Sequence, residues 1–312
     1  MNIAYLISVY HDPKQMGRML HALQGKDTYF FIHVDAKANQ REFEAAIPEG
    51  AKNHVQFTKK RYWVQWGGFN QVRYQRELLS ASLSSGIEFD RVFIVTGQDY
   101  PLWSNERIEQ ELADNPSKEY ITGLDISWLI EHTGGGKLRD KLILYHFFRD
   151  MKYVPYKVKK VFSGGSRIIM RLLPIRKKPY AMIKGKRMDV YQSSGYMCVT
   201  AALAKYVLQE MDENKELMRY FRFAFVAEEL VIPTIVFNSR FRGNGMIYDE
   251  RRYDGLKSLS AVTYFNYGKS IQVFTIADYE ELKASGKMFA RKMATGVSDT
   301  LMDRLDKEHG IK

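Results

Sequence analysis

Two adjacent glutamates, Glu228 and Glu229, stand at the start of an apolar segment of the chain. Acidic side chains in the first turn of a helix often do no more than complement the helix dipole. Beside a pocket, however, a carboxylate can act as the general base that removes a proton from a reacting hydroxyl. Composition alone leaves both interpretations of this pair open.

A second group of candidate residues is cationic and lies toward the C-terminal end, with Lys269 in one segment and Arg291 and Lys292 in another. A fixed pair of cations can hold a diphosphate and stabilise the charge of a leaving group without a metal ion. Taken alone, these residues are better explained as solvated surface cations, because Lys and Arg are mostly exposed in folded proteins.

Aromatic side chains form a third group. The loop Trp63-Val64-Gln65-Trp66-Gly67-Gly68 and the separate Tyr267 could stack on a uracil or a sugar ring, and packing in the core explains them equally well.

Several common motifs are missing. The sequence has no G-x-G-x-x-G, no P-loop and no zinc-type Cys/His spacing, which argues against dinucleotide, P-loop and zinc sites. No Asp-x-Asp occurs that could hold a diphosphate-bound divalent metal. His33 and Asp35 could share a metal, but two ligands are too few, and a hydrogen-bonded pair at a strand end is preferred. We therefore expect neither a cofactor nor a metal ion.

The elements that position these residues alternate in type over the first third of the chain. Short apolar runs at 3–9, 29–34, 54–58 and 92–95 predict strands, and helices are expected at 13–24, 40–46 and 68–85. This βαβ order predicts a parallel sheet with helices on both faces, whose ligands bind beyond the C-terminal strand ends. Farther along, the sequence predicts a strand at 195–199 and helices at 105–113, 201–211, 228–237, 278–284 and 298–309. Pro233 should kink or restart the helix at 228–237.

The composition is that of a globular protein with one unusual segment. Against 36 acidic residues stand 47 Lys and Arg, a formal net charge of +11. Twelve of the basic residues fall between Lys152 and Arg187, a stretch without a single acid. We expect one domain over 1–312, with a basic insertion or lid at about 152–187. Apolar residues are interleaved with the basic ones in this segment. It could therefore contact an anionic membrane surface or be a solvated insertion, and both interpretations stay open.

The single cysteine, Cys198, excludes an intrachain disulfide, and no apolar run is long enough to span a membrane. We expect a cytoplasmic protein, and peripheral contact with the inner face of the membrane is left open as an addition to this prediction. A nucleic-acid-binding protein is a remote alternative, because the excess charge is confined to one segment and no RNA-binding signature is present.

Taken in order and spacing, the motifs resemble the core-2/I-branching β-1,6-N-acetylglucosaminyltransferase family, which includes the peptide xylosyltransferases. The resemblance runs nearly from end to end and rests on 4–7, His11, 31–37, Trp66-Gly67-Gly68, 96–102, Ser193-Ser194-Gly195, Ala227-Glu228-Glu229, Asn238-Ser239, 262–264 and 274–292. It implies a GT-A-like fold and an inverting, metal-independent transfer from a UDP-sugar to a glycan or lipid-linked glycan. The most similar pattern is that of the branching enzymes, which favours N-acetylglucosamine as the donor sugar and a β-1,6 linkage. A xylosyltransferase of the same family is the alternative.

The resemblance also implies roles for single residues. The family's Pro-Asp-Glu motif falls on Ala227-Glu228-Glu229, which makes Glu229 the general base. The two cations that bind the diphosphate fall on Lys269 and Lys292. Nucleoside contacts map to Val9, Asp35 and Trp63, and sugar contacts to Tyr267 and Asp99.

The departures from the family pattern are Ala227 for Pro, Glu228 for Asp, Lys269 for Arg and Tyr267 for Trp. Vertebrate members also carry disulfides and a membrane anchor, so the resemblance suggests a bacterial relative.

Overall fold

The central sheet determines where the candidate residues meet. In the computed structural model, which describes residues 1–152, 154, 156–173, 175–268 and 270–311, this sheet has the strand order β10-β4-β1-β2-β3. β1 (Ile3–Val9) pairs in parallel with β2 (Thr28–Val34) and β4 (Arg91–Thr96), and β3 (Val55–Phe57) continues the parallel part. β10 (Met197–Thr200) closes the other edge as an antiparallel strand on β4. The predicted α/β class with a mainly parallel sheet flanked by helices is confirmed.

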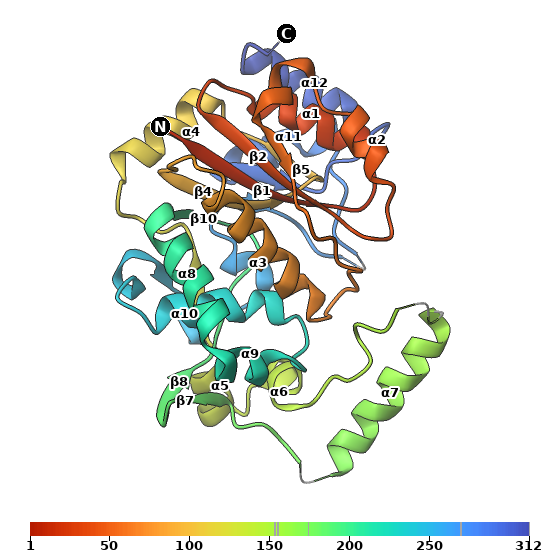
Figure 1. Ribbon diagram of the computed structural model, residues 1–312, viewed down its shortest axis with the longest axis vertical. Coiled ribbons are helices and arrows are strands. Elements are labelled where there is room, and N and C mark those ends of the chain that lie inside the picture. The colour runs from red at the N-terminus through yellow and green to blue at the C-terminus, as the bar shows by residue number, and fades with distance from the viewer. Residues whose placement is uncertain (153, 155, 174, 269, 312) are drawn as a thin grey trace.

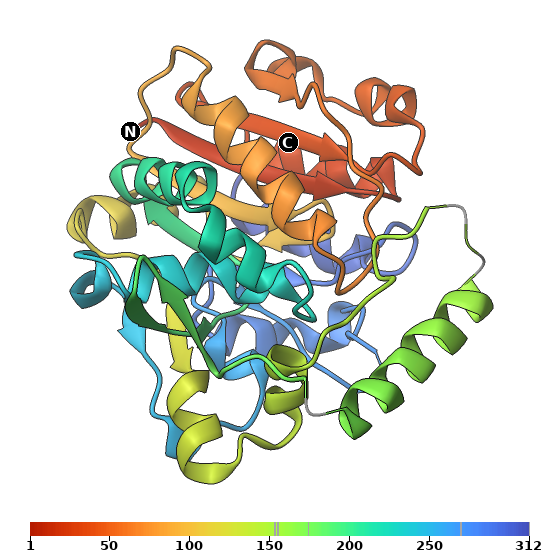
Figure 2. The same cartoon turned by 60° about the horizontal axis from the view of Figure 1, so that its bottom comes forward.

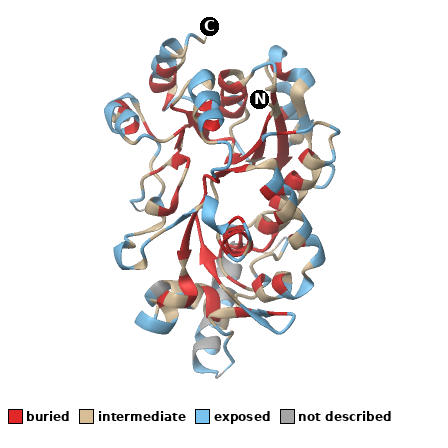
Figure 3. Cartoon of the chain, turned by 90° about the vertical axis from the view of Figure 1, so that its left-hand side faces the viewer, coloured by how far each residue is buried: buried red, intermediate tan, exposed pale blue. Residues whose placement is uncertain are grey.

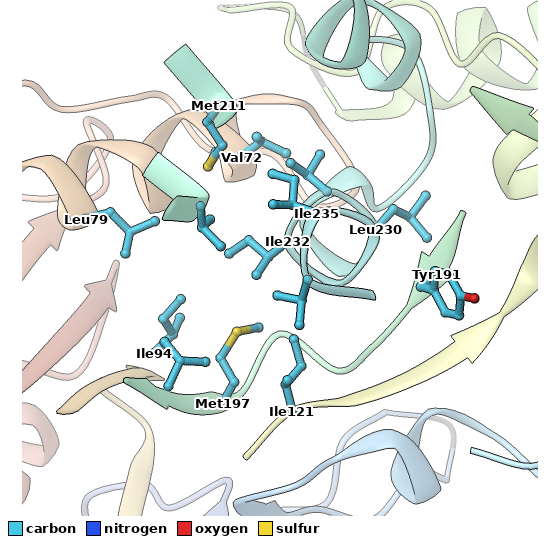
Figure 4. Close-up of a cluster of buried hydrophobic side chains, with 14 of the residues drawn as sticks. Val72, Leu79, Ile94, Ile121, Tyr191, Met197, Met211, Leu230, Ile232 and Ile235 are labelled. Carbon is cyan, nitrogen blue, oxygen red and sulfur yellow. The ribbon is translucent and has the colours of Figure 1, made fainter. Parts of the chain in front are cut away.

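Both faces of this sheet are buried, which explains the continuous apolar runs in its strands. Along β1, Ala4 and Leu6 belong to one hydrophobic cluster, and Tyr5 and Ile7 belong to the other. The first cluster packs under the helices α3 (Asn70–Leu83), α8 (Ala201–Glu213) and α10 (Val231–Phe237), and part of it is drawn in Figure 4. The second packs under α1 (Pro13–Leu23), α4 (Asn105–Asp114) and α12 (Asp299–Glu308). Figure 3 shows the buried residues on the strands and on the inner sides of these helices.

Smaller elements surround this core (Figure 1). The remaining α-helices are α2 (Gln40–Ala45), α5 (Ile126–Thr133), α6 (Gly136–Ile143), α7 (Tyr156–Leu172), α9 (Lys215–Phe221) and α11 (Tyr279–Ala284). The remaining strands are β5 (Asp99–Pro101), β6 (Thr122–Asp125), β7 (Tyr180–Ile183), β8 (Lys186–Asp189), β9 (Tyr191–Gln192), β11 (Met246–Ile247), β12 (Thr263–Tyr264) and β13 (Phe289–Arg291).

A small sheet of order β12-β13-β5 joins the C-terminal part of the chain to the segment that follows β4. β13 runs antiparallel to β5, and their register places Arg291 opposite Asp99. The end of the chain is also tied to the first helix. The Asp12 carboxylate caps α1 by accepting from the Gln15 amide and also accepts from the Thr295 amide at 2.9 Å.

The Trp-Gly-Gly motif leads into α3 and has a structural reason. Gly67 has a φ of 73° and packs so closely under Phe225 that a Cβ would lie 2.2 Å from its ring. A Cβ on Gly68 would lie 2.3 Å from an oxygen of Asp150. The Asp150 carboxylate accepts from two of the amides at the start of α3, those of Phe69 and Asn70, each at 3.1 Å. The two glycines therefore admit a ring and a carboxylate that come from distant parts of the sequence.

The helix predicted at 228–237 is divided in two. A 3₁₀ turn, η2 (Ala227–Glu229), comes first, and α10 restarts after it with Pro233 in its first turn, where a proline is tolerated. The prediction that Pro233 would force a restart is confirmed, and the restart frees the glutamate pair from the α-helix. The single-domain organisation stays a prediction. Among the described residues, no helix is long and apolar enough to cross a membrane.

Candidate active site

A pocket of about 410 Å³ opens where the parallel strands end. β1, β2 and β4 run in register, so their carboxyl ends bring Val9, Asp35 and Gly97 to one edge of the sheet, and all three line the pocket. Gly97 is needed for this approach, because a Cβ there would lie 2.6 Å from a methyl group of Val9. The location agrees with the prediction that ligands bind beyond the C-terminal strand ends.

The glutamate pair forms part of the pocket wall. Glu228 is buried and Glu229 is half-buried, and both line the pocket. Gln192 Nε2 donates to Glu229 Oε2 at 2.7 Å, which fixes that carboxylate against strand β9. The turn that presents the pair begins at Val226, whose φ of 53° is unusual for a β-branched residue. This local conformation is therefore imposed by the surrounding structure and not by the sequence of the turn itself.

Burial changes the acidity of both carboxyls. Burial raises the pKa of Glu229 to about 7, against the opposing effects of the Lys141 ammonium and the Gln192 hydrogen bond. The pKa of Glu228 is also raised well above its ordinary value, first by burial and then by the neighbouring Glu229. The two adjacent carboxyls titrate together, so the pair retains a proton to a higher pH than a single exposed carboxyl would.

Cations occupy another side of the same pocket. Arg291 and Lys292 both line it. Arg291 Nη1 donates to Thr96 Oγ1 and to Asp99 Oδ1, the latter at 3.3 Å, so the guanidinium is fixed by a buried ion pair. The pKa of Lys292 is lowered by burial and by the adjacent Arg291, as expected for two neighbouring cations. An anion bound here would relieve their mutual repulsion.

The loop after β2 forms the side of the pocket near the residues predicted to contact the nucleoside. Asp35 is buried, and its carboxylate accepts from the Lys37 amide at 2.9 Å and lies 3.3 Å from Lys37 Nζ. Lys37 Nζ also donates to the carbonyl of Val64 and lies 6.0 Å from the ring of Trp63. Val64 lines the pocket, whereas Trp63 stands one residue behind it.

Two exposed aromatic rings flank the pocket. Tyr267 is 55% exposed and Trp66 is 70% exposed, although each lines the wall. Each ring rests edge-on against a phenylalanine, Tyr267 on Phe265 at 5.4 Å and Trp66 on Phe225 at 4.8 Å. Exposed rings held in fixed orientations suit stacking on a sugar. Core packing, the alternative for these two aromatics, is excluded by their exposure.

Unpaired polar atoms gather in the same wall. Arg291 Nε, Glu228 Oε2, Gln75 Oε1 and Gln98 Oε1 are buried and have no hydrogen-bond partner among the described residues, and all four side chains line the pocket. Buried polar groups are normally paired, so such a concentration indicates a place where a polar ligand or water binds.

Five of the predicted site residues thus meet in one pocket: Val9, Asp35, Glu229, Tyr267 and Lys292. Lys269 lies outside the described residues. Trp63 and Asp99 are not in the pocket wall, and their contacts with the nucleoside and the sugar stay predictions. Asp99 is fully buried and its carboxylate accepts from the Thr96 amide and from Arg291, so it positions the arginine.

His33 resolves the alternatives left open for the strand end. Its Nε2 accepts from the Tyr62 amide at 3.0 Å, and its ring stacks on Tyr74 at 5.1 Å. Burial and the nearby Arg61 lower the His33 pKa to about 4, so the ring is neutral. His33 is therefore hydrogen-bonded at the strand end, but its partner is the Tyr62 amide and not Asp35. Among the described residues, no group of three or more His, Cys, Asp or Glu could hold a metal ion.

Lys141 and Gln192 are functional candidates that the sequence did not reveal. Both act on Glu229, yet they lie on α6 and β9, 88 and 37 positions away along the chain. No motif marks either of them, and only the folded arrangement brings them to the carboxylate.

Removing the Lys141 charge should shift the pH dependence of the reaction. The ammonium favours the ionised form of Glu229, so Lys141→Met should raise the Glu229 pKa above about 7. A base works when deprotonated, so the acidic limb of the kcat profile should move to higher pH, and activity at pH 6 should fall more than at pH 9. Turnover measured from pH 5 to 9 tests this. An unchanged acidic limb would mean that Lys141 does not act on the base.

Comparison with known proteins identifies the family of this chain. Residues 3–253 match the model of the Core-2/I-Branching enzyme family. The chain is 28% identical to xylosyltransferase 2 of Rattus norvegicus over 170 residues, 53% of this chain and 19% of that protein. It is 23% identical to a mouse (Mus musculus) beta-1,3-galactosyl-O-glycosyl-glycoprotein beta-1,6-N-acetylglucosaminyltransferase over 207 residues, 66% of this chain and 40% of that protein.

The aligned part therefore spans less than half the length of these relatives. Among solved structures, the galactosyltransferase LgtC is similar over 99% of this chain and 95% of its own, with 8% identity and a TM-score of 0.40. The match to the family model covers well over half of the sequence and includes the glutamate pair, so this chain belongs to the Core-2/I-Branching enzyme family of glycosyltransferases.

Proposed function

We propose that the protein is an inverting glycosyltransferase that moves a sugar from a UDP-sugar to a hydroxyl of an acceptor glycan. The observation that carries the proposal is the meeting, in one pocket, of a carboxylate whose pKa is raised to about 7 and two cations, one of which is held by a buried ion pair. A base and an anion site in one cavity are the two parts that such a transfer needs.

In this mechanism Glu229 removes the proton from the attacking hydroxyl. The oxygen then forms a bond to the anomeric carbon on the face opposite UDP, and the bond from that carbon to the diphosphate breaks. Lys292 and Arg291 offset the charge that grows on the departing UDP. Val9 and Asp35 contact the nucleoside, and Tyr267 stacks on the acceptor sugar. Lys269 is proposed as a further cation on sequence grounds alone.

The donor sugar is proposed to be N-acetylglucosamine, transferred in a β-1,6 linkage. The second candidate is xylose, which the similarity to rat xylosyltransferase 2 favours. The acceptor is proposed to be a free or lipid-linked glycan, and the setting to be the cytoplasm, where donor nucleotides are available. Nucleic acid is not proposed as a partner, because the excess positive charge is confined to the segment from Lys152 to Arg187.

We expect the reaction to proceed without a metal ion, because two cations stand where a metal would otherwise bind the diphosphate. The test is UDP release from a panel of UDP-sugars in excess EDTA, with a mixture of simple glycosides as acceptors. Release from UDP-N-acetylglucosamine would support the proposed donor, and release from UDP-xylose alone would replace it with the second candidate. Activity that EDTA abolishes and Mg²⁺ or Mn²⁺ restores would overturn metal independence.

The variant Lys292→Ala should weaken UDP binding by roughly 10- to 100-fold, the loss expected for one charge-assisted contact. Isothermal titration with UDP measures this directly. Lys14→Ala, which removes an exposed lysine of α1 outside the pocket wall, is the matched control and should leave the affinity unchanged. Equal affinities for both variants and the unmodified protein would remove Lys292 from the diphosphate site.

A further inference from the structure

Helix α7 stands apart from the body of the protein. Two views show it joined to the rest only through the segments at its ends (Figures 1 and 2). The helix has 17 residues, which corresponds to about 25 Å of length. It belongs to the segment that holds twelve basic residues and no acid. Phe162 of α7 contacts the ring of Phe148, with 5.9 Å between the ring centroids, but an apolar side running along the helix would need another partner.

Such an apolar side exists, and it is exposed. The described apolar residues of α7 form a stripe on one side of the helix in two groups, Val158, Val161 and Phe162, then Ile168, Ile169 and Leu172, with spacings of three and four inside each group and Gly165 between them. Val161 is 73% exposed and Leu172 is 80% exposed. A stripe of this width would be buried against the core in an ordinary surface helix.

We propose that α7 lies on the surface of an anionic lipid bilayer, with this stripe inserted among the head groups. Between the apolar positions the sequence places Lys157, Lys159, Lys160, Arg167 and Arg171, and an apolar stripe flanked by basic residues is typical of interfacial helices. A second copy of the chain would bring an equal positive charge against this one, whereas an anionic surface complements it. The helix is too short and too basic to cross the membrane, so it lies on the surface.

The points at which this segment leaves and rejoins the body are fixed. On one side the Asp150 carboxylate caps α3, next to Trp66 at the pocket wall. On the other side the Lys177 amide donates to the carbonyl of Ile143 at 2.9 Å, and Lys177 Nζ donates to the carbonyl of Tyr220 at 3.3 Å. Burial lowers the Lys177 pKa to about 7. A helix attached in this way would hold the pocket near the lipid surface. That consequence, unlike the binding itself, rests on the proposed function.

Vesicle flotation with the full chain tests the proposal. The protein should float with vesicles of phosphatidylglycerol and phosphatidylcholine at low salt, far less with phosphatidylcholine alone, and less again as salt is raised. Ile168→Gln/Leu172→Gln should reduce the bound fraction by about tenfold or more, because two large apolar groups would no longer be buried. Glutamine is a good helix former, so the helix itself should persist.

Val297→Gln is the matched control, since it removes an exposed apolar side chain on a different part of the surface. It should bind vesicles like the unmodified protein, and all three proteins should bind UDP equally in solution. Absence of binding to anionic vesicles at low salt, or equal binding by the double variant, would overturn the proposal. A dimer in sedimentation analysis that the double variant converts to a monomer, without vesicle binding, would identify a second copy as the partner and also overturn it. If the unmodified protein floats with anionic vesicles but does not bind UDP, the proposed reaction is contradicted and the membrane contact is supported.

Discussion

Glu229→Gln should lower turnover by about 10²- to 10⁴-fold, the range typical of a lost general base, while UDP binding stays near normal. The substitution keeps the size of the side chain. The amide oxygen of the new residue can still accept from Gln192 Nε2, which now bonds the carboxylate at 2.7 Å. The fold of the turn should therefore survive, and only proton acceptance is lost. Turnover by UDP release and affinity by titration separate the two effects.

Glu228→Gln is the control for this experiment, because it places the same change one residue earlier in the same wall. Burial and the neighbouring Glu229 raise the Glu228 pKa, which favours the neutral form of this carboxyl, so a neutral amide should change turnover little. Near-normal turnover of Glu229→Gln together with a large loss for Glu228→Gln would assign the base to Glu228. Near-normal turnover of both variants would move the base out of the pair.

The second large effect should come from Arg291. Arg291→Met leaves the fully buried Asp99 without its cation, and breaking a buried ion pair by removing one partner costs about 3–5 kcal/mol of folding free energy. Burial already raises the Asp99 pKa, and loss of the cation would raise it further. The buried charge is relieved when Asp99 binds a proton, so the destabilisation should be larger at pH 8 than at pH 5. Urea unfolding at both pH values measures it.

A double variant separates the structural role of Arg291 from its role toward the ligand. In Asp99→Asn/Arg291→Met no charge is left buried, and the Asn side-chain oxygen can still accept from the Thr96 amide, which now donates to Asp99 at 2.8 Å. Most of the lost stability should return, whereas UDP affinity should stay about 10- to 100-fold weaker. Recovery of both quantities would mean that Arg291 only supports the fold. A single variant as stable as the unmodified protein would contradict the importance of the ion pair.

The central sheet could be predicted from sequence because its pattern is local. β1, β2 and β4 are apolar on both faces, and the helices between them begin and end at recognisable signals such as Pro13 and Gly86. The location of the pocket beyond the carboxyl ends of the strands could be predicted from the parallel strand order alone. The antiparallel direction of β10 was not predicted, since an isolated apolar run carries no information about the direction of its partner.

Within the site, the residues that lie near motifs were predicted and those that depend on long-range pairing were not. The role of Asp99 follows from its register opposite Arg291, 192 positions away, and two three-residue strands leave no pattern from which to infer that register. The basic segment was identified by its charge, but its division into α7, β7 and β8 was not predicted. The exposure of its apolar stripe could be known only from the structure, in which Val161 and Leu172 are among the most exposed members.

The attachment of the C-terminal segment to the sheet has a consequence for when the protein becomes active during its synthesis. Arg291 and Lys292 reach the pocket through the pairing of β13 with β5, and β13 lies beyond the 3–253 range that matches the family model. α12 then fastens the segment, since Arg18 of α1 pairs with Asp303 and Asp306, each at 2.6 Å. Arg291 and Lys292 are made after the glutamate pair, so a growing chain that has folded its sheet and its glutamates still lacks both cations of the proposed anion site. The proposed base is thus in place before the proposed donor site is complete.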